Sequence, residues 1–387
     1  MILFLILMFI AFSIYYRHNM VKDYFIIFLL CLIVYIFFLF EYSFGFIDYL
    51  ISDSYDYYHD AEKWMKDKRF LWGYINYFVK EYDFLGDIFI KIINIPILMI
   101  LLFYLKNIFN VIKNPYIFLI FCPFLLMLSI SNLRDLLIML FAVLAINFYN
   151  DSFKYYFHIV LFSICVFSLR PFMAVTLIFS FILFDLISII FSRKNRMNSV
   201  LTMFIICLAF SSVTTIILPL INSYIYNANY YLNDGFEDRL KNRKLDLLIT
   251  SNSKINVYAT GMMRYVFSPQ PTSLFLRLVD SEKEKKYGIT SEIIRLFNQL
   301  VYYFILVYIL YNIKYLFRVF VSIFNKKQKI LLFWFFCYFP IYSFYHFGGT
   351  HQRLKIPFQL LFIIIYIYIS HYKSINSKHL SSNKIKI

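Results

Sequence analysis

An arginine and an aspartate stand side by side inside an otherwise apolar stretch covering residues 116–149. The local sequence is SISNLRDLLIML, with Arg134 and Asp135 at its centre. Asn132 could cap the helix that follows and place Asp135 at its third position, where an acid complements the helix dipole. Arg134 opposes that dipole. An arginine at this position indicates one of two roles. Arg134 either binds an anionic ligand through parallel guanidinium donors, or it pairs with headgroup phosphates or with an acidic residue of a loop.

Other cationic residues stand at comparable places along the chain. Arg170 follows an apolar segment in SLRPF, and Arg264 lies in GMMRYVFSPQPTSLFLRL. His351 and Arg353 occur in FGGTHQRLKIPF, after a flexible Gly–Gly pair and before the last apolar segment. The topology predicted below places all of them on one side of a membrane, together with Arg134. Such a gathering of cations at one depth predicts a site for a multiply anionic ligand.

An acidic cluster opens the first long polar segment, in SDSYDYYHDAEKW. Asp53, Asp56 or His59 could serve as a general base or orient an acceptor hydroxyl, and His351 is a further candidate for this role. Alternatively, the aspartates are simply solvated and the histidines belong to an interfacial aromatic belt.

Composition predicts the setting of these residues. The chain has 387 residues, of which 61% are hydrophobic and 16% charged, and several runs reach the ~20 apolar residues that cross a bilayer. We therefore predict an all-α, polytopic integral membrane protein that forms a single domain and contacts the lipid bilayer. The net charge of +16 is explained by basic cytoplasmic loops rather than by a nucleic-acid partner. All five cysteines fall in apolar runs, and we expect no disulfide, metal or cofactor.

The apolar pattern predicts about eleven transmembrane helices. The positive-inside rule places the short basic connectors in the cytoplasm. The two long loops, residues 42–85 and 223–295, are then extracytoplasmic because of the connectors that neighbour them. The N-terminus is then extracytoplasmic and the C-terminus cytoplasmic. The predicted spans are residues 1–16, 24–41, 86–105, 115–131, 133–149, 153–169, 172–192, 199–222, 296–313, 330–347 and 356–371.

One acid, Asp185, falls within the seventh predicted span. It could be a proton or cation site of a transporter, or it could be satisfied by a neighbouring Ser, Thr or Tyr. The other charged residues of the predicted spans stand near span ends, so no second charge deep in the membrane is evident, which favours the structural interpretation.

Five short motifs occur in a recognisable order over most of the chain: DSYDYYHDA, FCPFLLMLSISNLRDLLIMLFAV, SLRPFMAV, RYVFSPQPTSLF and HQRLKIPF. In this order they resemble the O-antigen and repeat-unit polymerases of the Wzy type and the related lipid-sugar-dependent glycosyltransferases of the GT-C superfamily. The resemblance implies a GT-C-like fold with an active site on the outer face. Two predicted spans, rather than one, precede the acidic loop of this chain.

The resemblance also implies a function and roles for residues. The substrate would be undecaprenyl-pyrophosphate-linked oligosaccharide, polymerised in surface polysaccharide synthesis at a bacterial plasma membrane, with a chain-length regulator as a candidate partner. Arg134, Arg170 and Arg353 would hold the pyrophosphates, with Arg264 beside them, and Asp53 would be the early carboxylate. The alternatives are a glycosyltransferase that adds one sugar from a polyprenyl-phosphate donor, and a flippase or transporter. Because bidentate phosphate binding needs a guanidinium, Arg134→Lys is expected to impair activity more than Asp135→Asn.

Overall fold

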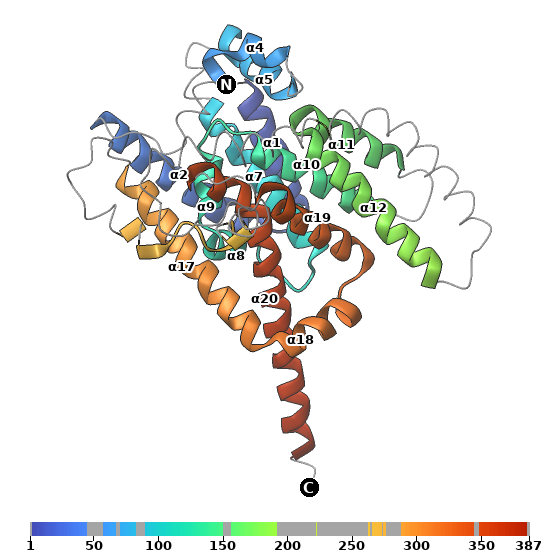
Figure 1. The fold of residues 1–387 in the computed structure, drawn as a ribbon. Helices are drawn as coiled ribbons and strands as arrows, with labels where there is room; N and C mark the ends of the chain where they lie inside the picture. The colour runs from blue at the N-terminus through green and yellow to red at the C-terminus, as the bar shows by residue number, and fades with distance from the viewer. Residues whose placement is uncertain are drawn as a thin grey trace, which may run out of the picture.

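The structure is a computed structural model that describes residues 2–44, 57–66, 70–82, 90–149, 156–191, 222, 262–263, 265–272, 274–275, 288–343 and 348–384. Within these ranges the regular structure is helical (Figure 1). The helices are α1 (Ile2–Arg17), α2 (Val21–Ser43), α4 (Ala61–Met65), α5 (Phe70–Tyr82), α7 (Asn94–Ile108), α8 (Ile117–Phe121), α9 (Phe124–Ser129), α10 (Asp135–Phe148), α11 (Tyr156–Leu169), α12 (Pro171–Phe191), α17 (Ile289–Tyr311), α18 (Ile313–Arg318), the π-helix η2 (Val319–Ile323), α19 (Lys326–Tyr342) and α20 (Gly348–Lys384).

Four helical stretches are long and apolar enough to cross a membrane: Val21–Ser43, Ile90–Ile108, Ile289–Tyr311 and Gln352–Ile375. The outer surfaces of α2 and α17 present large apolar side chains, among them Phe25, Phe40, Phe304 and Val307. Water would penalise such surfaces, whereas lipid tails accommodate them. The chain is therefore a helical membrane protein. The number of eleven spans remains a prediction.

The centre of the bundle is formed by α7 and α10. Their sequences are apolar on every side, as expected of helices surrounded by other helices. Leu98 and Leu102 of α7 are fully buried, as are Ile138 and Val143 of α10. α10 also packs against α11, α11 against α12, and α12 against α19, while α20 contacts both α17 and α19. The polar ends of α10, α12 and α20 are thus held by a closely packed apolar core.

The segment predicted as one span over residues 115–131 instead contains two short helices, α8 and α9. The break falls at Cys122 and Pro123. Proline has no backbone N–H and disfavours helical geometry at the residue before it, and Cys122 accordingly leaves the helical region with φ −136° and ψ 68°. The chain therefore reaches the Arg134 region by a broken path rather than by a single helix.

Three other boundaries differ from the sequence prediction. The segment 42–85, predicted as a loop, contains α4 and α5. α17 begins at Ile289 rather than at 296, because its first turns bury polar side chains instead of ending in solvent. α20 starts at Gly348, so the Gly–Gly pair predicted to be flexible forms its first residues, and it continues to Lys384. Figure 1 shows the C-terminal part of α20 extending away from the bundle, at the end opposite to α4, α5 and the N-terminus.

Candidate functional site

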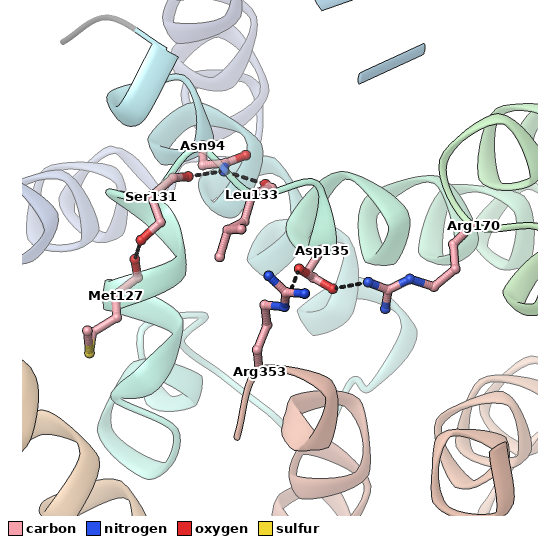
Figure 2. A network of polar contacts seen from close by, with 7 residues as sticks. All are labelled: Asn94, Met127, Ser131, Leu133, Asp135, Arg170 and Arg353. Atoms are coloured by element: carbon pink, nitrogen blue, oxygen red, sulfur yellow. Dashed lines mark hydrogen bonds and ion pairs between the residues drawn. The ribbon is translucent and has the colours of Figure 1, made fainter. Parts of the chain in front are cut away.

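The termini of three helical regions meet around one carboxylate, that of Asp135. Asp135 is the first residue of α10, Arg170 joins α11 to α12, and Arg353 lies in the second turn of α20. Arg170 Nη2 lies 2.9 Å from Asp135 Oδ1, and Arg353 Nε lies 3.3 Å from Asp135 Oδ2. Figure 2 shows the two guanidiniums approaching the carboxylate from different sides. Residues far apart in the sequence are thus brought together at the helix ends.

Arg134 completes this group, and its backbone is the N-cap of α10. Its guanidinium lies over the ring of Tyr57, with 5.4 Å to the ring centroid, and is within electrostatic range of Asp135. Arg170 lies similarly over the ring of Tyr342, at 5.5 Å. Stacking on an aromatic face orients a guanidinium, and Arg170 is also within hydrogen-bonding reach of the Tyr338 and Tyr342 side chains. We refer to Arg134, Asp135, Arg170 and Arg353 as the arginine cluster.

Buried amides fix the turn that precedes α10. Asn94 Nδ2 donates to the carbonyls of Ser131 at 2.6 Å and Leu133 at 2.7 Å, as Figure 2 shows. Ser131 Oγ donates to the carbonyl of Met127 at 2.6 Å. These bonds replace the helical hydrogen bonds that the turn lacks, so the position of the arginine cluster is set by α7 and α9.

The prediction that Asn132 caps α10 is wrong. Asn132 Nδ2 donates instead to Asn76 Oδ1 of α5, at 2.6 Å, and the N-cap of α10 has no side-chain cap hydrogen bond. Asp135 is accordingly the first helical residue, not the third. Its carboxylate is occupied by two arginines, because these approach from other helices and outcompete a local cap. A short-range motif could not reveal this, since the partners lie 35 or more positions away.

The other predicted site residues are distributed as follows. Asp53, Asp56 and Arg264 lie outside the described residues, as does the side chain of His351, whose backbone is in the first turns of α20. His59 is exposed, and its backbone carbonyl accepts from Lys80 Nζ at 3.1 Å. The first polar segment nevertheless reaches the arginine cluster, because Tyr57 contacts Arg134.

The electrostatics of the arginine cluster favour an anion. One carboxylate carries a single negative charge, whereas three guanidiniums surround it, all nine-tenths or more buried. Burial by itself lowers the pKa of Arg170, but Tyr342 and Asp135 raise it more, so its net pKa is above the ordinary value and the group stays charged. Arg170 Nη1 has no hydrogen-bond partner within the described ranges. The cluster thus presents oriented cationic donors of the kind that bind phosphate oxygens.

The aromatic partners Tyr57 and Tyr342 were missed by the sequence analysis. Tyrosine is common in this chain, and no spacing distinguishes these two from the other 33 tyrosines. The same applies to Asn94, whose role in shaping the turn depends on a contact 37 residues away.

A second ion pair lies far from the arginine cluster. Asp185 Oδ1 accepts a short hydrogen bond from the Tyr149 hydroxyl and lies 2.7 Å from Lys326 Nζ. A neighbouring tyrosine thus satisfies Asp185, as the structural interpretation expects, and the charge beside it, Lys326, comes from a predicted basic connector rather than from a span. Asp185 stands 15 residues after Arg170 along α12, a separation of roughly 22 Å at the helical rise. Asp185 therefore forms a structural contact at the opposite end of α12.

No group of three or more His, Cys, Asp or Glu side chains that could hold a metal ion occurs in the described residues. Searches of protein-family models, of curated proteins and of solved structures each found no match to this chain.

Proposed function

We propose that this chain is a glycosyltransferase that polymerises undecaprenyl-pyrophosphate-linked oligosaccharide repeat units at the extracytoplasmic face of a bacterial plasma membrane. The observation that supports this proposal is the convergence of Arg134, Arg170 and Arg353 around Asp135 at the ends of α10, α12 and α20. A pyrophosphate attached to a membrane lipid lies at the depth where helices of a bundle end. Buried guanidiniums there can bind it.

The reaction requires stabilisation of a leaving group. The bond between the sugar C1 and the pyrophosphate oxygen of one lipid carrier breaks, and a bond forms between C1 and an acceptor hydroxyl oxygen of a second unit. The electron pair of the broken bond stays on the polyprenyl pyrophosphate. Fixed cations lower the energy of that developing charge because they are already oriented before the reaction. In this proposal Arg134, Arg170 and Arg353 bind the pyrophosphate, and Arg264 joins them.

The proton of the acceptor hydroxyl must be accepted by a base. The candidates are Asp53, Asp56, His59 and His351. The contact of Tyr57 with Arg134 supports the first three, because it connects the acidic segment to the arginine cluster within four residues of Asp53. Asp135 is a positioning residue rather than the base, since both of its oxygens lie next to arginines.

The proposal includes a topology of about eleven spans in a GT-C-like arrangement, with the N-terminus outside and the C-terminus in the cytoplasm. Figure 1 supports opposite sides for the two ends, because they lie at opposite ends of the bundle. Lys373 of α20 donates to Asn312 at the C-terminal end of α17, at 3.0 Å, and so lies on the side of the bundle where the positive-inside rule expects basic residues.

Polymer length in cells tests the proposal. A strain that lacks the gene should display surface saccharide of a single repeat unit, and the gene should restore a ladder of longer chains. Purified protein given polyprenyl-pyrophosphate-linked repeat units should form the same ladder. Single additions would indicate the one-sugar glycosyltransferase instead.

A transporter is the second candidate, because α17 and α20 bury polar side chains within apolar helices, among them Glu292, Arg295 and Lys355. Charged groups inside membrane helices are common along transport pathways. The deletion strain separates the two functions. A strain lacking a flippase displays no surface saccharide, whereas a strain lacking a polymerase still displays single units.

A further inference from the structure

α17 and α20 face each other through buried polar side chains. The polar residues of α17 recur every three or four positions, which places them on one face of the helix, and those of α20 do the same. All of them are at most 3% exposed. We call the following five residues the polar seam: Glu292, Gln299 and Tyr302 of α17, and Gln352 and Gln359 of α20.

Hydrogen bonds across the polar seam are incomplete. Arg295 joins the helices, with Nη1 2.5 Å from Glu292 Oε1 and Nε donating to Gln352 Oε1 at 2.8 Å. Asn298 Nδ2 donates to Gln359 Oε1 at 3.1 Å. Each of the five seam residues nevertheless keeps one polar atom with no hydrogen-bond partner in the described part of the chain: Glu292 Oε2, Gln299 Oε1, the Tyr302 hydroxyl, Gln352 Nε2 and Gln359 Nε2.

Such a network is costly if its role is only structural. A buried polar atom without a partner loses its hydration and gains nothing, so a half-satisfied network is less stable than an apolar interface. The unpartnered atoms include amide donors and carbonyl or carboxylate acceptors. A ligand that binds both the donors and the acceptors must itself accept and donate hydrogen bonds, and a hydroxyl group can do both. The polar seam also begins at Gln352, directly beside Arg353 of the arginine cluster.

A short segment, residues 265–268, lies across both helices at this level, and we call it the strap. Lys355 Nζ of α20 donates to the carbonyls of Val266 at 2.5 Å and Ser268 at 3.2 Å. The Tyr303 hydroxyl of α17 donates to the carbonyl of Phe267. Lys355 is fully buried and lies over the ring of Tyr302, at 4.2 Å from its centroid. The strap is therefore held by side chains of both helices, next to the polar seam.

We propose that the polar seam binds the hydroxyl groups of the saccharide carried by a lipid-linked substrate, which enters when the strap lifts away from Lys355. The inference rests on the proposed function, because a pyrophosphate in the arginine cluster brings its attached saccharide to Gln352. The saccharide hydroxyls then form hydrogen bonds with the unpartnered polar atoms of α17 and α20.

Tyr302→Phe is the sharpest test, because it removes only the unpartnered hydroxyl and keeps the ring beneath Lys355. Gln299→Met is the second variant, since it keeps the length of the side chain and removes the unpartnered carbonyl, together with a long Nε2 bond to the Phe267 carbonyl of the strap at 3.5 Å. Tyr311→Phe is the matched control, because Tyr311 is on the same helix and is 85% exposed. Each variant is expressed in the deletion strain, where the cell supplies the substrate. Polymer is measured on gels, and the thermal midpoint is measured on purified protein.

A saccharide site predicts at least a fivefold loss of polymer in Tyr302→Phe and Gln299→Met, with thermal midpoints equal to or above the wild-type value. Tyr311→Phe should match the wild type in both measurements. Polymer within twofold of wild type in both seam variants would overturn the inference, as would a loss of polymer accompanied by lower midpoints in both. If the wild-type gene restores no polymer, the proposed function fails and this inference with it. Wild-type polymer with unaffected variants removes only the saccharide site.

Discussion

Asp135→Asn removes one negative charge from between two buried guanidiniums, and we expect it to destabilise the protein by about 3–5 kcal/mol, the usual cost of breaking a buried ion pair. The side chains of Asp135, Arg170 and Arg353 are 9%, 9% and 8% exposed, so water screens the pair little. Asparagine could still accept a hydrogen bond from one arginine, but its amide donors would face the other. The expected loss is a large part of the 5–15 kcal/mol or so that stabilises a typical protein.

The free energy of unfolding can be measured by denaturant titration of the purified protein in detergent. Glu62→Gln is the matched control, because it neutralises an exposed carboxylate on α4 and should change stability by no more than about 0.5 kcal/mol. A double-mutant cycle with Arg170→Gln should show that the two changes are not additive, because they share one interaction. A loss below about 1 kcal/mol for Asp135→Asn would refute the ion-pair reasoning, since that is the range of exposed pairs.

Three further changes test other parts of the structure. Arg134→Lys should lower polymer yield with little change in thermal midpoint, because a lysine cannot present parallel donors to phosphate; a yield equal to wild type would contradict the role of Arg134. Gly288→Ala should lower the free energy of unfolding by about 1–2 kcal/mol, because the new Cβ would lie 2.1 Å from Glu41 Oε2. It would displace the Glu41 carboxylate, which accepts a hydrogen bond from the backbone N–H of Thr290 in the first turn of α17. An unchanged free energy of unfolding would show that Glu41 does not cap this helix. A double-mutant cycle of Asp185→Asn and Lys326→Met should give a coupling free energy of about 1 kcal/mol or less, because Lys326 is partly exposed and solvent screens the ion pair. A larger coupling would point to a role beyond local structure.

The order of two effects changes once the tertiary contacts are included. From the sequence alone, Asp135 was interpreted as a helix-start residue, so Asp135→Asn was expected to be milder than Arg134→Lys. The structure places the Asp135 carboxylate between arginines of two other helices. Asp135→Asn is therefore expected to affect folding itself, whereas Arg134→Lys is expected to affect substrate binding.

Composition and hydropathy determined the class of this protein. An apolar majority with few charges cannot form a water-soluble surface, so a helical membrane protein follows from the sequence, as do most helix positions. The sequence also singled out Arg134, Arg170 and Arg353, because a cation within or beside an apolar helix is costly and needs a reason.

Only the tertiary structure decided which charges meet. Whether Asp135 caps its own helix or binds Arg170 and Arg353 depends on packing between helices that lie far apart in the sequence, and local spacing contains no information about it. The same holds for the polar seam, whose residues were not singled out as candidates. Their helical spacing is visible in α17 and α20 separately, but their burial and their unpartnered atoms arise only where these two helices pack together.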